Sequence, residues 1–597
     1  MIFNYFLIII PTKIKNLISR LKQKLPNLSI SGGKKPTWQQ WKKFFKILPS
    51  RERWLVRSLI SVILISLAIL LFGVYSNKTN LVPQIGGSYR EGILGQPRFI
   101  NPVLSQTNDA DRDLVQLIYS GLFKYDQQGN LIPDLAKEYI ISEDGLNYDI
   151  TLKRNIFWHD GEPLTVSDII FTIKTIQDSE YKSPLKDTWQ GVEIEKIDEF
   201  TVRFKLNNTY APFLYNLTVG ILPRHLWFGI SASNFFLAQY NLRPIGSGPY
   251  KFKEFSKDSN GKIESMELIR NEKFYLSGPY IEKIILEFYN TQSDLISAYQ
   301  KRQIDGLSFL STANQSKLRN DLNLNEINLP IYYAVFFNQT ENKALADKIV
   351  RNALAYATNK EEIINQVLQG QGTPVNSPLL AGWPSYDPET KIYDFALEHA
   401  QNILEQADWK DSDNDGFREK TINDEEVKLE INLLTTNWPE LEQIAKLLQE
   451  QWGKIGMKVN LEIIDATTVQ QEYIRPRQYQ ALLFGEVLSA DPDPFAFWHS
   501  SQRKDPGLNL ALYNNKKVDD LLEEARQSMN QETRIQKYIE FQKLLIEDMP
   551  VIFLHSPPYL YPVKKEIKGI NIEKLAQPSQ RFSQIENWFI KTNRIWK

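Results

Sequence analysis

An uninterrupted apolar segment near the N-terminus constrains this chain more than any other feature. Residues 58–77 are twenty consecutive uncharged residues, mostly Leu, Ile, Val and Ala. At about 1.5 Å per residue, such a helix spans about 30 Å, the thickness of the hydrocarbon core of a bilayer. Residues 1–57 hold thirteen lysines and arginines against one acid, Glu52. Because basic residues flank the cytoplasmic end of a membrane helix, we expect a basic cytoplasmic tail at 1–57, one anchor at 58–77 in the cell membrane, and everything that follows outside.

The chain contains no cysteine. This excludes disulfide bonds, thiol catalysis and zinc sites made from cysteine. It also excludes a bacterial lipoprotein anchor, because the lipid is attached to a cysteine behind the signal sequence. We therefore expect the apolar segment to stay in place as an uncleaved signal anchor. A cleavable signal peptide is the alternative.

The part of the chain that follows the N-terminal tail is acidic. The whole chain carries −1 and residues 1–57 carry +12, so the remaining residues carry −13. An acidic exported body argues against a nucleic acid as partner. With 597 residues, of which 42% are hydrophobic, the chain is long enough for two or more domains with large cores.

After a short linker at residues 78–85, strand-like and helix-like patterns alternate along the chain. Apolar residues take every second position at 148–152, 202–206 and 457–463, which predicts strands with one buried face. A helix is expected behind Thr165, where TVSD resembles a capping box. A second is expected behind Asn437 as its cap, with one apolar face made by Leu441, Ile444, Ala445, Leu448 and Trp452. This alternation predicts an α/β protein with two mixed lobes.

A series of short motifs then resembles one family. The motifs are GLFKYD at 121–126, LIPDLA at 131–136, SEDG at 142–145, YDITLK at 148–153, WHDG at 158–161, YAPF at 210–213, ILPRH at 221–225 and IGSGPY at 245–250, followed by RN at 270–271, FN at 337–338, VR at 350–351 and DP at 491–492. In this order and spacing, over about residues 86–590, they resemble the solute-binding proteins of peptide-type (oligopeptide, dipeptide, nickel) ABC importers, bacterial extracellular solute-binding protein family 5.

The resemblance implies a two-lobed fold of the periplasmic-binding-protein type, in its large cluster C form, which closes on a ligand about a hinge. Lobe I would comprise residues 86–330, with a subdomain inserted at 126–244, and lobe II residues 331–555. Residues 556–597 would return to lobe I. Pro330 and the pair Pro557 and Pro558 lie where the two hinge crossings are expected.

We find no catalytic or metal constellation in the sequence, so neither enzyme activity nor a cofactor is expected. The five histidines are scattered, and the chain has no G-x-S-x-G elbow and no phosphate-binding glycine loop. DSDNDG at 411–416 resembles the start of an EF-hand loop, but Ile422 stands where the bidentate glutamate belongs. We expect Asp411, Asp413 and Asp415 to form a solvated β-turn. A calcium site is the alternative.

The segment FGEVLSADPDPFAFW at 484–498 is the main candidate for ligand binding, because the matching loop of the family faces the cleft. The resemblance implies that, in the family's peptide receptors, an aspartate a few residues before the Asp-Pro pair holds the α-amino group of the peptide. Leu488 takes that position here. Glu486 or Asp491 would then have to replace it, and Asp491 is slightly favoured. The alternative is that Asp491 and Asp493 cap the loop and the following helix.

Seven further residues are cleft candidates by their position in the resemblance. Asn338 follows a cleft-facing strand and would bind a peptide backbone. Arg351 would clamp a ligand carboxylate, or pair with an acid inside its own lobe. The others are two residues of lobe I loops and three aromatic residues that line pockets or belong to the core: Asn108, Ser247, Trp438, Trp498 and Tyr513.

The sequence thus predicts a receptor on a membrane tether that captures a peptide and delivers it to the permease subunits of an ABC transporter. It is expected to be a monomer. A non-peptide solute on the same fold remains open as ligand. From other classes, an extracellular hydrolase or a surface sensor is the alternative.

Overall fold

The structure is a computed structural model that describes residue 38 and residues 49–383, 385–489, 491 and 493–597. It divides into a small unit, Met1–Val82 with Arg594–Lys597, and a body, Pro83–Asn593. Most of the basic tail expected at residues 1–57 lies outside the described residues.

The small unit contains the apolar helix. Helix α3 runs over Ser50–Lys78 and has no buried side chain. Its mean hydropathy reaches 2.6, so it is long and apolar enough to cross a bilayer, and the span expected at 58–77 lies within it. The segment expected as a linker instead forms strand β1 (Thr79–Gln84), which pairs with the last strand, β23 (Lys591–Trp596). No local pattern reveals this pairing, because the two strands lie at opposite ends of the chain.

A seven-stranded sheet organises the first lobe of the body. Its order is β13-β22-β12-β2-β11-β10-β9. Its strands come from three stretches of chain: β2 (Ser88–Leu94), then β9 (Tyr250–Lys257), β10 (Ile263–Arg270), β11 (Lys283–Tyr289), β12 (Gly306–Leu307) and β13 (Leu322–Ile327), and finally β22 (Tyr559–Lys564). β2 runs parallel to β11 and β12, and the other pairs are antiparallel. Helices α4 (Asp109–Ile118) and α9 (Gln292–Gln300) contact β2.

A smaller antiparallel sheet lies in the chain between β2 and β9. Its order is β5-β6-β8-β7, with β5 (Ala136–Ile141), β6 (Asn147–Leu152), β7 (Val192–Lys196) and β8 (Thr201–Leu206). The hairpin β3 (Phe123–Tyr125) and β4 (Leu131–Pro133) precedes it, and the short helices α6 (Phe213–Asn216), α7 (Arg224–Trp227) and α8 (Ala232–Phe235) follow it. The two alternating patterns predicted here are confirmed, because β6 and β8 each bury every second residue.

The helix predicted behind Thr165 is also confirmed. α5 spans Val166–Gln177, and the carboxylate of Asp168 accepts a hydrogen bond of 2.8 Å from the backbone N of Thr165. This is one half of the capping box that TVSD predicts.

A six-stranded sheet organises the second lobe. Its order is β15-β21-β14-β20-β18-β19, with β14 (Ile331–Phe337), β15 (Thr373–Pro374), β18 (Glu430–Thr436), β19 (Lys458–Ile464), β20 (Ala481–Val487) and β21 (Val551–Ser556). Lobe II also contains the hairpin β16 (Glu419–Ile422) and β17 (Glu425–Lys428) and the α-helices α10 (Lys343–Ala346), α11 (Lys348–Ala357), α12 (Lys360–Gln366), α13 (Leu397–Gln406), α14 (Pro439–Gly453), α15 (Ala466–Thr468), α16 (Phe495–Trp498), α17 (Lys516–Gln527) and α18 (Gln531–Asp548).

Helix α14 buries the apolar face that the sequence predicts. The prediction of Asn437 as its cap was wrong, because the cap is Trp438 and Pro439 is the first helical residue. The backbone N of Asn437 donates to the carbonyl of Ile464 at 2.9 Å. Asn437 therefore still belongs to the pairing of β18 with β19.

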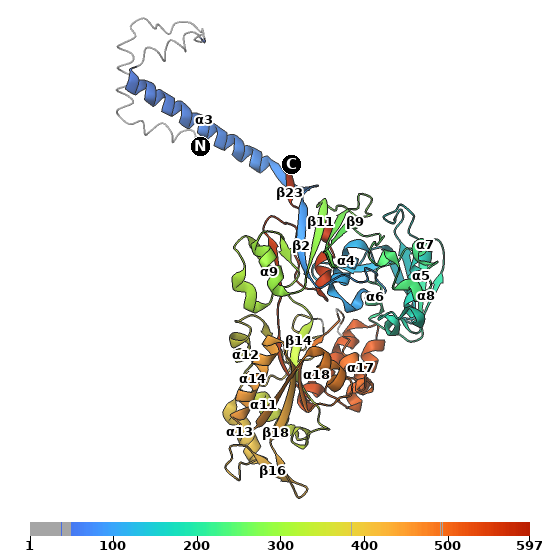
Figure 1. The fold of residues 1–597 in the computed structure, drawn as a ribbon, viewed down its shortest axis with the longest axis vertical. Coiled ribbons are helices and arrows are strands. Elements are labelled where there is room, and N and C mark those ends of the chain that lie inside the picture. The colour runs from blue at the N-terminus through green and yellow to red at the C-terminus, as the bar shows by residue number, and fades with distance from the viewer. Residues whose placement is uncertain (1–37, 39–48, 384, 490, 492) are drawn as a thin grey trace. The chain divides into compact units, whose positions relative to one another are not determined.

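The chain passes from the first sheet to the second between β13 and β14, and returns between β21 and β22. Figure 1 places β2, β9 and β11 in one lobe of the body and β14 and β18 in the other. Each lobe has its own main hydrophobic core, and the core of lobe II is made only of residues between Tyr332 and Leu554. The predicted α/β, two-lobed fold class is confirmed. The exact domain limits stay a prediction.

Candidate functional site: the cleft between the lobes

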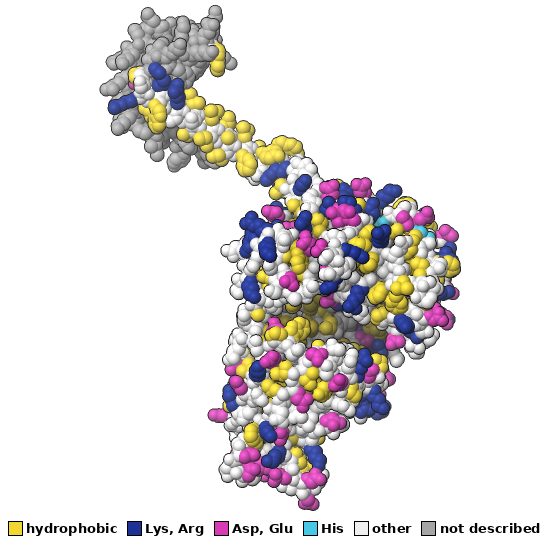
Figure 2. All heavy atoms as spheres, viewed as in Figure 1, with side chains coloured by type: hydrophobic (Ala, Val, Ile, Leu, Met, Phe, Trp, Pro, Cys, Tyr) yellow, Lys and Arg dark blue, Asp and Glu magenta, His cyan; other side chains and the backbone are white. Residues whose placement is uncertain are grey.

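The body is hollowed between its lobes, and hydrophobic side chains are visible in the hollow (Figure 2). A groove of about 960 Å³ lies between the small antiparallel sheet and lobe II, lined among others by Asn208, Tyr210, Phe495 and Arg526. A cavity of about 180 Å³ in lobe I is lined by polar residues that include Gln116, Tyr215, Thr218 and Gln577. Hydrogen-bonding groups and aromatic rings dominate both hollows, which suits a polar ligand with apolar side groups.

The loop behind β20 carries two aspartates, and each has an arginine partner. Asp491 is 5% exposed and accepts hydrogen bonds from both terminal nitrogens of Arg534, one of them at 2.8 Å. Asp493 accepts from Nε of Arg526 at 2.9 Å and from the Tyr210 hydroxyl at 3.4 Å. The charges of this loop are therefore balanced within the protein.

The charge of Asp491 acts on residues of lobe I. Burial raises the pKa of Tyr125 and Tyr215, and the nearby carboxylate of Asp491 raises both further. Tyr215 lines the cavity of lobe I. The backbone N of Ala211 also donates to the carbonyl of Arg526 at 2.9 Å. The loop of lobe II, through Asp493, and helix α17 thus both contact lobe I across the cleft.

Beneath the loop, the side chain of Glu486 is buried rather than offered to the cleft. Its carboxyl accepts a hydrogen bond from the hydroxyl of Tyr332, while Oε1 has no partner among the described residues. Burial raises the pKa of Glu486 to about 8, so the group is mostly protonated at neutral pH. Leu488 is 7% exposed and belongs to the core of lobe II.

Strand β20 has an open side next to this loop. All seven of its residues pair with β14, but its pairing with β18 covers only Ala481 and Leu482. In the described part of the chain, no strand pairs with the β18-facing side of residues 484–487. Gly485 lets the ring of Tyr333 lie against this strand, because a Cβ at residue 485 would stand 2.9 Å from Tyr333 Cε1. Unpaired backbone groups on such a strand are a template for an added strand.

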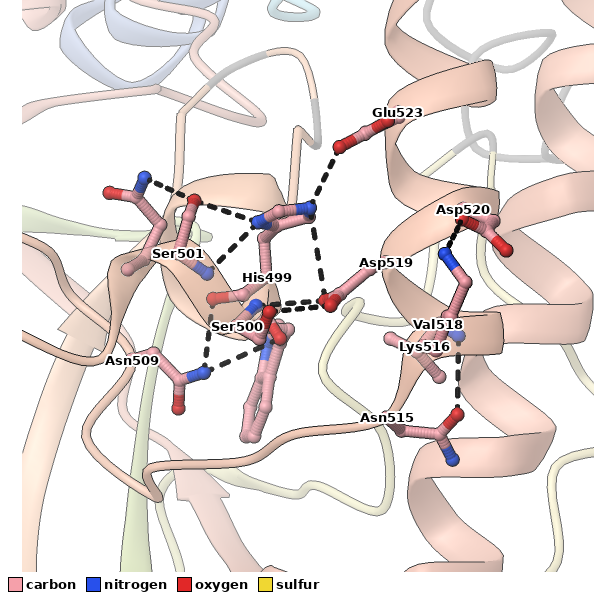
Figure 3. A network of polar contacts seen from close by, with 12 residues as sticks. His499, Ser500, Ser501, Asn509, Asn515, Lys516, Val518, Asp519, Asp520 and Glu523 are labelled. Carbon is pink, nitrogen blue, oxygen red and sulfur yellow. Dashed lines mark hydrogen bonds and ion pairs between the residues drawn. The ribbon is translucent and has the colours of Figure 1, made fainter.

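Polar contacts hold the segment behind the loop in place (Figure 3). The ring of His499 stacks on Phe495 with centroids 4.1 Å apart, and its Nε2 lies 3.1 Å from a carboxylate oxygen of Glu523 on α17. The backbone N of Ser500 donates to Asp519 at 2.8 Å. The guanidinium of Arg526 also packs on the ring of Phe495, 4.1 Å from the ring centroid. These contacts fix one wall of the groove.

In lobe I, the two predicted residues, Asn108 and Ser247, have different surroundings. The side chain of Asn108 caps α4, accepting from the backbone of Ala110 and Asp111, and donates to the carbonyl of Gln96 at 2.8 Å. Ser247 is fully buried, and its Oγ has no partner among the described residues. Their role in ligand binding stays a prediction.

In lobe II, Arg351 and Tyr513 both contact Asp548. The guanidinium of Arg351 donates to four carbonyl oxygens, among them those of Asp548 and Met549. The Tyr513 hydroxyl donates to the carboxylate of Asp548 at 2.6 Å. The structure thus brings these two residues together around the end of α18.

Of the other predicted residues of lobe II, only Trp498 lies in the segment of the acidic loop, and it is 1% exposed. Asn338 donates to the carbonyl of Arg477 at 3.1 Å and is buried. Trp438 is 55% exposed. Sequence reasoning missed Arg526 and Arg534, since neither lies in a motif and each reaches the loop from a helix that follows it.

The acidic turn at 411–416 belongs to lobe II and directly precedes the hairpin β16–β17 in the sequence. Carboxylate oxygens of Asp411, Asp413 and Glu419 lie within 4.8 Å of one another. Asp415 accepts instead from the backbone N of Phe417 at 2.8 Å. The solvated turn stays a prediction.

The family of the chain follows from its match to known proteins. The family model of the bacterial extracellular solute-binding proteins, family 5, matches residues 130–508, so the chain belongs to this family of extracytoplasmic solute receptors. This confirms the resemblance found in the motifs.

Individual relatives match over most of their length. An oligopeptide-binding protein, AppA of Bacillus subtilis, is 29% identical over 520 residues, 85% of this chain and 92% of the relative. The dipeptide-binding protein of Escherichia coli is 24% identical over 512 residues, 81% of this chain and 92% of the relative.

Solved structures show the same fold. NikZ from Campylobacter jejuni, in complex with Ni(L-His), is 29% identical with a TM-score of 0.70, covering 84% of this chain and 99% of that one. AppA from B. subtilis in complex with a nonapeptide is 27% identical with a TM-score of 0.68, covering 85% of this chain and 100% of that one.

Proposed function

We propose that this chain is a membrane-anchored receptor that captures peptides between its two lobes and delivers them to the permease subunits of an ABC transporter. The open side of β20 carries the proposal, because it lies next to the cleft loop and offers unpaired backbone groups. An extended peptide can add to it as a strand, so the protein reads the peptide backbone and not one sequence. The names of the relatives in B. subtilis and E. coli support a peptide as ligand.

The work of the receptor is binding and closure, not catalysis. A ligand that touches both lobes binds the closed form better than the open form, and so shifts the protein toward closure. The separate cores of the lobes support movement about crossings near residues 330 and 556. We assign residues 86–330, with the insert 126–244, and 556–597 to lobe I, and 331–555 to lobe II. The receptor acts as a monomer, because one chain supplies both walls of the cleft.

Helix α3 is the anchor in this proposal, with residues 1–57 on the cytoplasmic side and the lobes outside the cell membrane. The charge asymmetry around the helix supports this orientation, and the absence of buried side chains along α3 is compatible with an anchor. N-terminal sequencing of the native protein tests it: a mature chain that begins near residue 80 would show a cleaved signal peptide and overturn the anchor.

Native mass spectrometry of the full chain in detergent tests the ligand class. The probes are a pentapeptide and the same pentapeptide with N-methylated backbone amides, mixed in equal amounts. We expect the protein to retain the first and not the second, because N-methylation removes the donors that pair with β20. Equal retention of both would overturn backbone recognition. Retention of neither, with a metal chelate or another solute found on the purified protein, would overturn the peptide as ligand.

A further inference from the structure

The end of helix α3 is joined to the C-terminal strand by a compact set of contacts. The rings of Tyr75 and Trp596 meet edge to face, with centroids 5.8 Å apart. The guanidinium of Arg594 lies 5.6 Å from the Tyr75 centroid and donates to Oγ1 of Thr79 at 2.9 Å. The backbone N of Lys597 donates to the carbonyl of Lys78 at 2.9 Å. We call this group of residues the clasp, and all of it belongs to the small unit.

The composition of the clasp is that of a membrane interface. It surrounds the end of the uncharged stretch of α3, with Tyr75 inside this stretch and Lys78 directly after it, and β1 and β23 contain no acidic residue. Its basic residues are Lys78, Arg594 and Lys597. Trp596 is 68% exposed and Ile595 is 49% exposed, although both are large apolar side chains. Tryptophan and tyrosine gather at the level of lipid headgroups, where the ring lies among apolar groups and its polar edge reaches water.

We propose that the clasp formed by Tyr75, Lys78, Arg594, Trp596 and Lys597 binds the phospholipid headgroup interface at the outer end of α3. This rests on the proposed function of α3 as an anchor. The exposed Trp596 ring enters the interface, and the basic groups lie at the depth of the lipid phosphates, to which they are complementary in charge. Because residues 79–82 directly precede the body and residues 594–597 directly follow it, this contact holds both ends of the body's chain at the bilayer.

We expect lipid rather than protein to contact the clasp, because the clasp lies at the outer end of the membrane-spanning helix. Residues that directly follow a membrane-spanning helix lie within the headgroup region, whose thickness is several residues of extended chain. Trp596 is tied to Tyr75, which lies inside the uncharged stretch, so it is held at the depth of that residue. A protein partner such as the permease would have to compete with lipid for the same ring.

Fluorescence quenching by brominated lipids tests the proposal on the full chain in phosphatidylcholine vesicles without any permease. The variant Trp596→Phe is compared with the wild type, and the difference spectrum isolates the emission of Trp596. We expect this emission to be strongly quenched by lipids brominated at shallow acyl positions. Trp438→Phe is the matched control, because Trp438 is also exposed but lies in lobe II, so its emission should not be quenched.

A third variant, Trp54→Phe, separates the clasp from the anchor, because Trp54 lies at the other end of α3. If Trp54 is quenched and Trp596 is not, α3 spans the bilayer, the lipid contact of the clasp is overturned, and the exposed ring is left for a protein partner. If neither is quenched, the anchor itself is overturned and the clasp with it. Quenching of Trp54 and Trp596, but not of Trp438, supports both.

Discussion

Asp491 and Arg534 form a two-pronged ion pair between the cleft loop and helix α18, with one hydrogen bond of 2.8 Å from Nη1. Their side chains are only 7% and 15% exposed. The pair therefore sits where water cannot readily replace either partner. The carboxylate expected to hold a ligand's amino group is already bound by a residue of the protein.

The first prediction concerns the strength of this pair. Asp491→Asn should lower the free energy of unfolding by about 3–5 kcal/mol, because it leaves the buried guanidinium of Arg534 without its counter-charge. Urea denaturation in detergent measures it. The double variant Asp491→Asn with Arg534→Gln should cost less than the sum of the single variants, because neither charge is then left alone.

Lys516→Gln is the control for this prediction. Lys516 pairs with Asp520, but its side chain is 90% exposed. Exposed pairs contribute about 0–1 kcal/mol, so the control should barely change stability. If Asp491→Asn costs no more than Lys516→Gln, the pair is not buried in solution.

The second prediction concerns Glu486 and pH. Its pKa in the folded chain is about 8 against an ordinary value of 4.5, because burial disfavours the charge. Between these values the unfolded chain has released the proton and the folded chain has kept it. The free energy of unfolding therefore falls as pH rises through this window, by up to about 1.4 kcal/mol per pH unit. The stabilisation that comes from burying the protonated Glu486 is fully present below pH 4.5.

Glu486→Gln removes this titration, so the variant should gain stability relative to the wild type between pH 5 and pH 8. Denaturation at both pH values measures the gain. Glu450→Gln, on an exposed position of α14, is the control and should follow the wild type at both. A variant less stable than the wild type at pH 8 would mean that Glu486 is charged and useful in the fold.

The third prediction concerns the close approach at Gly485. Its Cβ position is 2.9 Å from the ring of Tyr333, which stacks on His555 with centroids 5.1 Å apart. Gly485→Ala should cost about 1–3 kcal/mol, because a packed ring has to move. Gly453→Ala is the control, since no atom lies within 4 Å of its Cβ position, and it should leave stability unchanged or raise it. Equal effects in denaturation would show that Tyr333 moves freely.

Local sequence patterns predicted much of the secondary structure. The alternation at 148–152 and the TVSD motif at 165–168 predict β6 and the start of α5, because each depends on neighbours in sequence. The pairing of β1 with β23 could not be predicted, since its partner lies at the other end of the chain. Asn437 also failed as a cap, because its backbone belongs to a sheet that only the fold creates.

The site divides in the same way. The sequence motifs were enough to find the loop at 484–498. They also showed that Leu488 stands where the family's peptide receptors have an aspartate. Whether Asp491 is free to bind a ligand could not be read from the loop. The answer depends on Arg534, which lies 43 residues further along the chain and in no recognisable motif.

The last prediction follows from that pair. Asp491 and Asp493 each have an arginine partner, and Glu486 is buried, so the loop offers no uncompensated charge to an ammonium group. A ligand's ammonium group would lose its hydration in the closed cleft without gaining a counter-charge. We therefore expect a pentapeptide and its N-acetylated form to bind the wild type with similar affinity in calorimetry.

Arg534→Gln should change this preference. The variant leaves the buried carboxylate of Asp491 without its partner, and the ammonium group of a free peptide can then take the place of the guanidinium. The variant should bind the free pentapeptide more tightly than the acetylated one, while Lys516→Gln should keep the behaviour of the wild type. If acetylation already abolishes binding to the wild type, the ammonium group displaces Arg534 on binding, and Asp491 is the amino anchor after all.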